Sequence, residues 1–563
     1  MNLNHARRRL DTSDGSFYIA FDIETITERN TDVPISATIR TNLYKDSVAL
    51  MRIAEVVRAR DHVQRVTLVM GTPANKAIVS AAGLYTELLD AARPNDIMIV
   101  VDADTDEALA AATAEIAGLL DGTGAGADAS AAVAAAIPLR SIAMGRARAG
   151  SDAALAQISV PGPYAAAEAL KALRLGLHVF LFSDNVPLEQ ERAVKDVARR
   201  KGLLVMGPDC GTAIVNGTPL GFANVVRSGS IGLVGASGTG LQEATCQIHA
   251  LGHGVRHAIG TGGRDVYAEI GGTTMSQAIA LLAADAGTRV IAIVSKPPAP
   301  AVARQILKQL VDTGKPAVVL FIGADLSGEA LPRHVIAVST LYDVAAAAVA
   351  LADGKPFVPS ALAEESVRAA DAEARRLAPG QRYLRGLYSG GTFCTEAQVL
   401  WRALDLRVHS NAPVAKGAQP DAAHSHSAID LGDDEYTVGR PHPMIDARAR
   451  VDCIAQAAAD PSTAAIVLDV VLGYAGHEDP AGALAPAIVQ AKAAAAKAGR
   501  YLPVITFVCG TEEDPQRLSH QQAQLRDAGA LVLPNHTSAA RLAGRIAMHA
   551  AAYAERVAET EGQ

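Results

Sequence analysis

The amino-acid sequence predicts a multidomain α/β protein in which parallel sheets are covered by helices on both faces. The chain has 563 residues, enough for about four domains of ordinary size. Hydrophobic residues make up 49% and charged residues 20% of the chain, so large apolar cores are expected. From residue 154 onward, short apolar segments alternate with helical ones, a pattern typical of βαβ units.

The first 150 residues are expected to hold one small domain between two irregular stretches. Residues 1–35 are polar and predict an N-terminal extension with a short strand near Phe17–Ile23. Residues 36–122 alternate short strands and helices, which predicts a small α/β domain of ferredoxin-like type. Glycine and alanine dominate residues 123–150, where hydrophobic periodicity disappears, so we interpret this stretch as a linker.

The remainder of the chain predicts three further α/β units. They span residues 151–227, 228–355 and 383–555, and a charged helical connector is expected at 356–382. Strands that are apolar on both faces need helices on each side of the sheet. Each unit is therefore predicted to contain a parallel sheet covered in this way.

Composition excludes several classes of function. The formal net charge of −8 argues against nucleic acid as the main partner, because a phosphate backbone needs a basic surface. The sequence contains no apolar run of membrane-spanning length and no signal peptide, so we expect a cytoplasmic protein. The five cysteines form no CxxC pair, so neither a metal site nor a disulfide framework is predicted.

Glycine-rich turns after predicted strands are the main candidates for ligand binding. In open parallel sheets, ligands bind beyond the carboxyl ends of the strands, where a helix start can hold an anion. The strongest candidate is Gly235–Gly240, which directly follows the strand Ile231–Val234; the alternative is a tight turn needed only for packing. Its phosphate-binding candidates are Ser237, Gly238, Thr239 and Gly240.

Two further turns share this pattern. Residues 260–264 combine three glycines with an arginine, although a flexible surface turn is the alternative. Residues 473–478 follow the apolar strand Ala465–Val471, with a capped helix start as the alternative. The additional phosphate-binding candidates are Gly262, Gly263, Arg264, Gly473 and Gly476.

The segment Asp430–Asp446 supplies two candidate catalytic residues. Arg440 could hold a carboxylate or phosphate through its planar guanidinium group. His442 lies between Pro441 and Pro443, and the stiffness of this segment suits a site residue. The alternative for His442 is a structural or solvated histidine.

Three other reactive side chains have simpler interpretations. Cys210, in the turn at 207–211, could be a nucleophile, but a lone cysteine beside a core strand is more often a small buried apolar residue. His424 and His426 lie in a polar loop, so we expect them to be solvated rather than bound to metal.

At this point the motifs resemble a known family. Three motifs between residues 207 and 265 follow one another in an order that resembles the α subunit of succinyl-CoA synthetase. The C-terminal third of the chain resembles the CoA-ligase domain of the β subunit of that enzyme. The presence of both regions on one chain, together with four further motifs, resembles the FdrA family. The three α-subunit motifs are GPDCGT (207–212), GASGTGLQE (235–243) and GTGGRD (260–265), and the further four are MGTPANKA (70–77), FSDNVPLE (182–189), SKPP (295–298) and DDEYTVGRPHPMID (433–446).

The resemblance implies a Rossmann-like CoA-binding-type domain at 151–227, followed by two flavodoxin-like synthetase-type domains. One helix from each flavodoxin-like domain is expected to point at a shared phosphate, one starting at 237–240 and the other at 473–476. A CoA pocket is implied in the Rossmann-like domain. Its residues would be Pro161, Gly162, Tyr164, Ser183, Asn185, Gly207 and Pro208.

The sequence also departs from the synthetases. The strand Ala317–Phe321 is followed by no histidine that could be phosphorylated, Ser295–Pro298 replaces the acidic GEIGG turn, and an ATP-grasp domain is absent. The resemblance to the FdrA family therefore implies phosphorolysis of oxalurate to oxamate and carbamoyl phosphate. Lys296, Arg440 and His442 are its catalytic candidates.

Two alternative functions remain open. One is an acyl-CoA synthetase whose nucleotide chemistry resides on a separate partner, and the other is a non-catalytic sensor of a CoA ester. No cofactor is assigned with certainty: phosphate or an acyl phosphate is the expected ligand, and CoA is the further candidate. Companion subunits are expected as partners, a homodimer is an open alternative, and neither a membrane nor a nucleic acid is expected.

Overall fold

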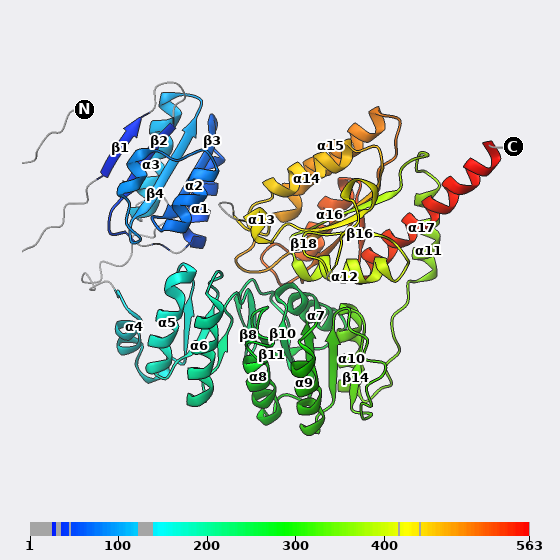
Figure 1. The fold of residues 1–563 in the computed structure, drawn as a ribbon, viewed down its shortest axis with the longest axis horizontal. Helices are drawn as coiled ribbons and strands as arrows, with labels where there is room; N and C mark the ends of the chain where they lie inside the picture. The colour runs from blue at the N-terminus through cyan, green and yellow to red at the C-terminus, as the bar shows by residue number, and fades with distance from the viewer. Residues whose placement is uncertain are drawn as a thin grey trace, which may run out of the picture. The chain divides into compact units, whose positions relative to one another are not determined.

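The computed structural model describes residues 25–29, 35–43, 45, 47–121, 139–414, 417–437 and 441–561. The chain divides into two compact units, residues 1–130 and 131–563 (Figure 1). The strand expected near Phe17–Ile23 lies outside the described residues, as does most of the expected linker. Within the described part of the chain, every helix is too short or too polar to cross a lipid bilayer.

The N-terminal unit contains an antiparallel four-stranded sheet in the order β1-β2-β4-β3. Helices α1 and α3 cover one face, and α2 and η1 cover the other. The edge strand β1 lies within the stretch that the sequence assigns to an extension, because a polar edge strand carries little hydrophobic signal. The elements are β1 (Thr25–Arg29), β2 (Ile35–Arg40), α1 (Ser47–Arg58), β3 (Val63–Met70), α2 (Pro73–Ala81), η1 (Glu87–Ala91), β4 (Ile97–Ala103) and α3 (Asp106–Asp121).

The second unit begins with a small parallel sheet in the order β5-β6-β7. Helix α5 packs against it through Ala165, Ala169 and Ala172, which are fully buried. Small side chains of this kind let helix and sheet approach closely, so few aromatic residues are needed. The elements are α4 (Ile142–Ala149), η2 (Gly150–Asp152), β5 (Leu155–Ile158), α5 (Gly162–Arg174), β6 (His178–Leu181), α6 (Leu188–Lys201) and β7 (Val205–Met206).

A seven-stranded sheet follows, in the order β14-β13-β12-β10-β11-β8-β9. Its first five strands are parallel, and the hairpin β8-β9 joins β11 in antiparallel fashion. Residues 212–221 therefore pair within this sheet, although the expected domain boundary lies at 227. The elements are β8 (Thr212–Val215), β9 (Thr218–Gly221), β10 (Ser228–Ala236), α7 (Gly238–Ala250), β11 (Val255–Gly260), α8 (Thr273–Ala284), β12 (Val290–Ser295), α9 (Pro300–Asp312), β13 (Ala317–Phe321), β14 (Val335–Ala337) and α10 (Leu341–Asp353).

The third sheet of this unit has six parallel strands in the order β16-β17-β15-β18-β19-β20. Helix α11 connects it to the preceding sheet. The elements are α11 (Glu364–Ala374), β15 (Tyr383–Tyr388), α12 (Gly391–Arg402), β16 (Val408–His409), η3 (Ala422–His424), β17 (His426–Asp430), α13 (Asp434–Thr437), α14 (Arg448–Ala459), β18 (Thr463–Val471), α15 (Pro480–Lys497), β19 (Val504–Cys509), α16 (Leu518–Asp527), β20 (Leu531–Leu533) and α17 (His536–Glu561).

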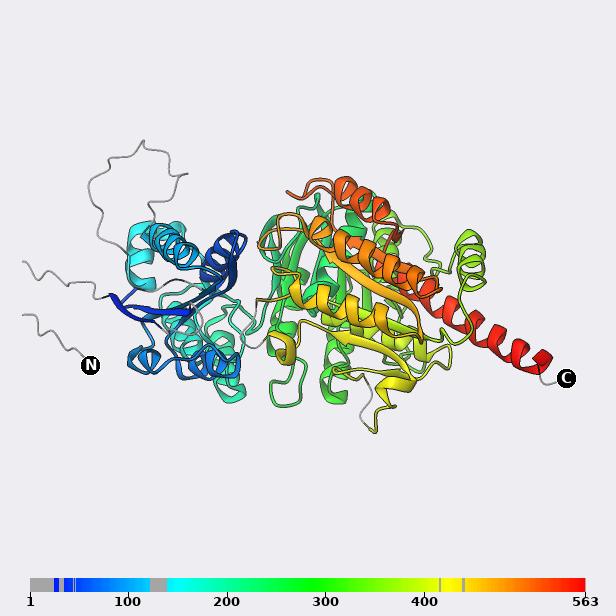
Figure 2. The same cartoon turned by 90° about the horizontal axis from the view of Figure 1, so that it is seen from above.

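One helix layer joins the two large sheets into a common core. Helices α7 and α10 from the first sheet and α12 and α17 from the second contribute to the same buried cluster (Figure 1). The outer faces are covered separately, by α8 and α9 on one sheet (Figure 1) and by α14, α15 and α16 on the other (Figure 2). The starts of α7 and α12 are therefore brought together by the core itself.

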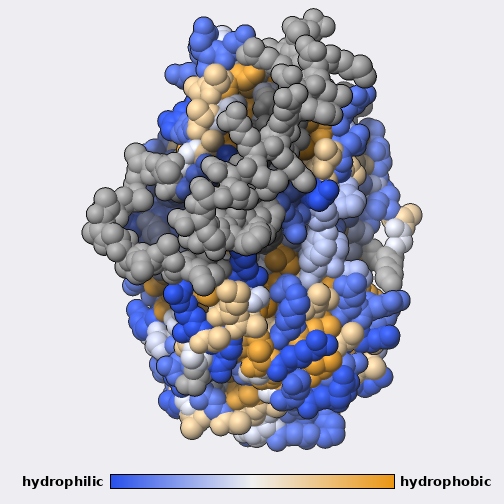
Figure 3. Space-filling view, turned by 90° about the vertical axis from the view of Figure 1, so that its left-hand side faces the viewer, coloured by the Kyte–Doolittle hydropathy of each residue, from blue (hydrophilic) through white to orange (hydrophobic). Residues whose placement is uncertain are grey.

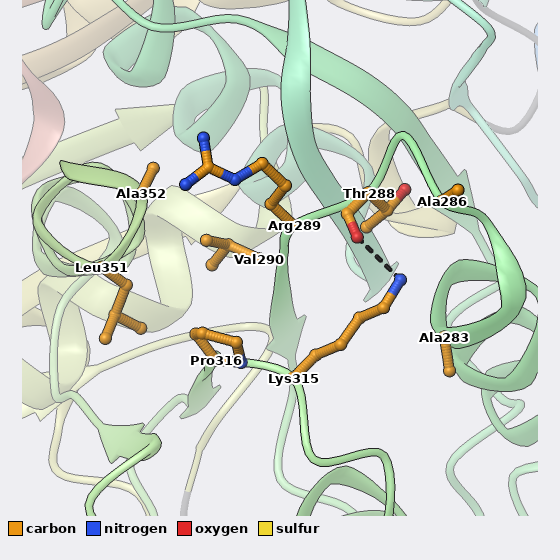
Figure 4. Close-up of a pocket in the computed structure, with 9 residues that line it drawn as sticks. All are labelled: Ala283, Ala286, Thr288, Arg289, Val290, Lys315, Pro316, Leu351 and Ala352. Carbon is orange, nitrogen blue, oxygen red and sulfur yellow. Dashed lines mark hydrogen bonds between the residues drawn. The ribbon is translucent and has the colours of Figure 1, made fainter. Parts of the chain in front are cut away.

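A cavity of about 440 Å³ lies at the amino ends of β12 and β13. Figure 4 shows Lys315 at its edge, with the ammonium group turned toward Thr288. Lys315 Nζ also donates to the backbone oxygens of Leu282 and Asp285, so it stabilises the end of α8 as a helix-terminal cation does. Because the glycine turns follow the carboxyl ends of the strands, this cavity belongs to the opposite edge of the sheet.

Apolar side chains are exposed near α4 and α5. Among the large ones are Leu139, Met144, Tyr164 and Leu175. On the face shown in Figure 3, apolar residues are interspersed with polar ones. Scattered apolar residues are common on protein surfaces and mark no particular function.

Candidate functional site

Helix α7 starts at the turn Gly235–Gly240, which is the strongest ligand-binding candidate in the sequence. Ser237 is its N-cap residue, and the Ser237 side chain accepts a hydrogen bond from Gly240 N at 3.2 Å. A methyl group at Gly240 would lie 2.3 Å from Ser237 Oγ and 2.8 Å from Val294 Cγ1. Glycine is therefore required here for the close packing of the turn.

The start of α12 faces the start of α7. Ser237 Oγ and Thr392 Oγ1 lie 2.5 Å apart in a hydrogen bond between the two helices. A Cβ at Gly390 would lie 2.7 Å from Thr239 Cγ2, so the two turns are in direct contact. The partner of α7 is thus the turn at 389–392, which the sequence analysis missed.

Residues 473–476 do not open a helix, so that expectation is wrong. Helix α15 begins at Pro480, and the side chain of Asp479 accepts a hydrogen bond from Gly482 N at 3.1 Å. The pair Asp-Pro is a strong helix-start signal, and it could have corrected the prediction. Gly473 N donates to Gln516 Oε1, so this N–H group is not free for an anion.

Gly473 instead serves a close approach between two segments. Its φ is +111°, and a Cβ there would lie 2.5 Å from the backbone oxygen of Ala223. Tyr474 N donates to the same oxygen at 3.0 Å. Gly476 lies in the same turn and faces no neighbour closer than 3.5 Å from an added Cβ.

A buried carboxylate holds the turn before α12. Asp469, on β18, accepts hydrogen bonds from Ser389 N, Ser389 Oγ and Gly390 N. Arg450 Nη2 pairs with the same carboxylate at 2.8 Å. Both charged side chains are buried, so the turn is fixed from the neighbouring strand rather than by its own side chains.

Four backbone N–H groups remain unused at the two helix starts. Among the described residues, the N–H groups of Gly238, Thr239, Gly391 and Thr392 have no acceptor. Free N–H groups and the positive ends of two helix dipoles favour an anion. The contact between α7 and α12 places both sets at one location.

The turn at 260–264 is tied to the smaller sheet. Gly262 has a φ of +80°, and an added Cβ would lie 2.2 Å from the backbone oxygen of Pro208. Arg264 donates to the backbone oxygen of Val186 and pairs with Glu191 at 2.9 Å. Arg264 therefore already has protein partners, whereas Gly263 has open space beside it.

The loops of the expected CoA pocket meet at the carboxyl edge of the small sheet. A Cβ at Gly162 would lie 2.3 Å from the backbone oxygen of Asp184, and one at Gly207 would lie 2.2 Å from that of Leu181. Ser183 Oγ donates to Val160 O. Pro161, Asn185 and Pro208 lie in the same loops, and Tyr164 lies in the first turn of α5, where it is 41% exposed.

Lys296 is exposed, and its charge influences two aspartates, Asp209 and Asp430. Part of Asp209 is accessible to solvent. Its carboxyl group is surrounded by protein, and this desolvation raises its pKa to about 6. The charge of Lys296 opposes that rise, while Asp184 adds to it. Burial also raises the pKa of Asp184, and Asp434 contributes in the same direction.

Asp430 lies against the start of α12. It is 7% exposed, and burial raises its pKa to about 6, against the opposing charge of Lys296. A Cβ at Gly391 would lie 2.4 Å from Asp430 Oδ2. The absence of a side chain at Gly391 therefore lets this carboxylate approach the helix start.

His442 lies in the same region, and burial lowers its pKa to about 4. Its ring centroid is 5.8 Å from that of Phe222. Arg440, the other candidate of this segment, lies outside the described residues.

The remaining reactive residues resolve simply. Cys210 is buried and its pKa is raised to about 12 by that burial, which agrees with a small apolar role. His426 is buried, not solvated as expected, because its Nδ1 accepts a hydrogen bond from Leu384 N. His424 is exposed and pairs with Asp421. Within the ranges that the structure describes, no group of three potential metal ligands occurs.

Two family models match the two large sheets of the second unit, and both have descriptions that refer to CoA. The CoA-ligase family matches residues 387–546, and the CoA binding domain family matches residues 226–323. The CoA binding match covers the first of the two large sheets, beyond the 151–227 unit to which we assigned the CoA pocket. A third family, described as AllF, heavy metal-associated domain, matches residues 33–136.

The chain belongs to the same family as the uncharacterized protein YahF of Escherichia coli K12. The two are 40% identical, over 90% of this chain and 98% of YahF. The comparisons do not support the narrower assignment to the FdrA family or to oxamate carbamoyltransferase.

More distant relatives are ligases. The chain is 32% identical to a mitochondrial succinate–CoA ligase [ADP-forming] subunit alpha-2 of Trichomonas vaginalis, over 31% of this chain and 58% of that subunit. Among solved structures, the dinucleotide-forming acetyl-coenzyme A synthetase 1 of Ca. Korarchaeum cryptofilum aligns over 72% of this chain and 85% of its own. The identity is 16% and the TM-score 0.27.

Proposed function

We propose that this protein is the acyl-transferring subunit of an acyl-CoA ligase-type enzyme and works with a separate nucleotide-binding partner. The observation that carries the proposal is the contact between the starts of α7 and α12, with four free N–H groups at one place. Such a site suits the phosphate of an acyl phosphate. The relation to succinate–CoA ligase α subunits supports both the reaction class and the need for a companion subunit.

In this proposal, three cationic or polar side chains act on the acyl phosphate. Lys296, whose charge reaches Asp209 and Asp430, balances the charge of the phosphate. Arg440 and His442 are assigned to the acyl portion. The loops carrying Gly162, Asn185 and Gly207 would hold CoA.

The carbamoyl transfer suggested by the FdrA resemblance is less well supported, because none of the relatives described above carries that activity in its name. A sensor that binds CoA without turnover stays an alternative, and it predicts binding without catalysis. The half-reaction of CoA with acetyl phosphate, which yields acetyl-CoA and inorganic phosphate, needs no nucleotide. It therefore tests this chain without its partner.

The helix-start site can be tested with Gly238→Pro and its matched control Gly238→Ala. Proline suits the first helical position but lacks the N–H group, and Ser237 before it has the extended conformation that proline requires (φ −165°, ψ 107°). A Cβ at Gly238 has only Thr212 Oγ1, at 3.7 Å, nearby. Losing one hydrogen bond to a charged group costs about 1.5–3 kcal/mol.

We therefore expect Gly238→Pro to bind inorganic phosphate and acetyl phosphate about tenfold or more weakly in isothermal titration, whereas Gly238→Ala binds like the natural chain. Acetyl-CoA formation should fall in parallel. Equal affinities for the two variants would contradict the assignment of this helix start, and binding without acetyl-CoA formation would favour the sensor.

A further inference from the structure

His442, in the segment before α14, has a defined hydrogen-bonding pattern. His442 Nδ1 accepts a hydrogen bond from Met444 N at 3.2 Å. A backbone N–H group can only donate, so Nδ1 carries no proton in this arrangement. The turn between Pro441 and Pro443 fixes the ring in this contact, because the next two residues, Ile445 and Asp446, both donate to His442 O.

The surroundings keep this imidazole neutral. Burial is the largest influence on its pKa, which falls to about 4, and the charges of Asp469 and Arg450 act in opposite directions. Phe222 covers the ring on another side. A neutral imidazole without a proton on Nδ1 carries it on Nε2, so Nε2–H is a hydrogen-bond donor.

The Nε2 atom lies above Gly432, beside the start of α12. A Cβ built at Gly432 would lie 2.8 Å from His442 Nε2, 2.9 Å from Ser389 O and 3.2 Å from Asp430 Oδ1. Nε2 is thus next to both the turn held by Asp469 and the carboxylate that approaches Gly391. Across the described residues, the hydrogen bond of this ring is the one at Nδ1, and Nε2 makes none.

We propose that His442 is a catalytic hydrogen-bond donor, whose Nε2–H binds an oxygen of the acyl group held at the start of α12, and that it does not act as a base. This inference rests on the proposed function. The imidazole stabilises negative charge on that oxygen during transfer and retains its proton throughout. A donor aimed at a developing oxyanion contributes roughly 10²–10³-fold to the rate of an acyl transfer.

The paired variants His442→Gln and His442→Ala separate a donor from a base. The glutamine side chain can place an N–H donor near the position of Nε2 but cannot accept a proton at neutral pH. We expect His442→Gln to keep acetyl-CoA formation within about tenfold of the natural chain, while His442→Ala loses roughly 10²–10³-fold. Equal loss in both folded variants would overturn the proposal.

A second measurement does not depend on turnover. Long-range ¹H–¹⁵N correlation spectra of the full-length chain should show His442 with a protonated Nε2 and a bare Nδ1 from about pH 5 to about pH 8. A protonated Nδ1 in that range would overturn the proposal even if neither variant folds. If acetyl-CoA formation is absent while the expected tautomer is observed and acetyl phosphate binds less tightly to His442→Ala than to His442→Gln, the ligase function fails and the donor role stands.

Discussion

The two large domains of the second unit have the same arrangement of strand, glycine turn and helix, but different residues hold the two turns. Apart from the edge strand β16 and the hairpin β8-β9, the five parallel strands of the two sheets follow the same spatial order, β11-β10-β12-β13-β14 and β17-β15-β18-β19-β20. In each sheet, the central strand β10 or β15 leads through a glycine turn into an inward-facing helix. Each helix also stabilises the other domain: Glu243 on α7 accepts a hydrogen bond from His536 N at the start of α17. Glu396 at the same position of α12 accepts one from Leu341 N at the start of α10. The two domains therefore also contribute equivalent glutamates to the interface between them.

The difference lies in how each domain holds its glycine turn. In the first domain, the turn is capped by its own residue, Ser237. In the second, Gly390 has no side chain to cap the helix, and Asp469 performs this task from the adjacent strand with Arg450 as its counter-ion. At the equivalent place in the first domain, Val294 packs beside Gly240. One helix start is thus held locally and the other by a buried ion pair.

The largest expected effect comes from breaking that ion pair. Asp469→Ala leaves Arg450 as a buried charge without its partner and frees the N–H groups of Ser389 and Gly390. Removing one member of a buried pair costs about 3–5 kcal/mol, which urea unfolding of the second unit's domains would measure. The comparison would be wrong if Asp469→Ala cost no more than a typical surface substitution. Asp469→Asn is the control, since it keeps the volume and part of the hydrogen bonding.

The reciprocal glutamates offer a second, smaller difference. Burial raises the pKa of Glu243 to about 7, and one of its oxygens has no hydrogen-bond partner within the described part of the chain. Because the folded pKa lies above the unfolded one, the stabilising contribution is complete below about pH 4 and is lost as the pH rises through about 7.

The isosteric variant Glu243→Gln should remove this pH dependence, while the natural chain loses on the order of 3 kcal/mol across that interval. Stability measured by urea unfolding in a series of buffers provides the test, and only the difference between the two proteins is assigned to Glu243. Parallel stability curves for the two proteins would show that Glu243 does not titrate in this way.

Particular residues show what the sequence could and could not reveal. The start of α7 was predictable because strand, glycines, cap and helix are contiguous in Ile231–Gly240. The start of α12 was missed because Gly390 offers no capping side chain and its anchor, Asp469, is remote in sequence. Burial and then the charge of Asp184 raise the pKa of Asp209, while Lys296 opposes the rise, and only the folded chain brings these groups together. A motif whose residues are contiguous can be predicted from the sequence, whereas an interaction between charged residues that are distant in the sequence cannot.

The smallest expected effect comes from removing the hydroxyl group of Ser237, which caps the first of the two helices. Ser237→Ala removes both the cap of α7 and the hydroxyl contact with Thr392, whereas Thr392→Val removes only the contact. Loss of an N-cap serine costs about 1 kcal/mol, so Ser237→Ala should lower the free energy of unfolding by about that much more than Thr392→Val. Equal losses would mean that the hydroxyl pair between the helices, rather than the local cap, secures the first turn. The two domains would then depend on each other for both of their helix starts.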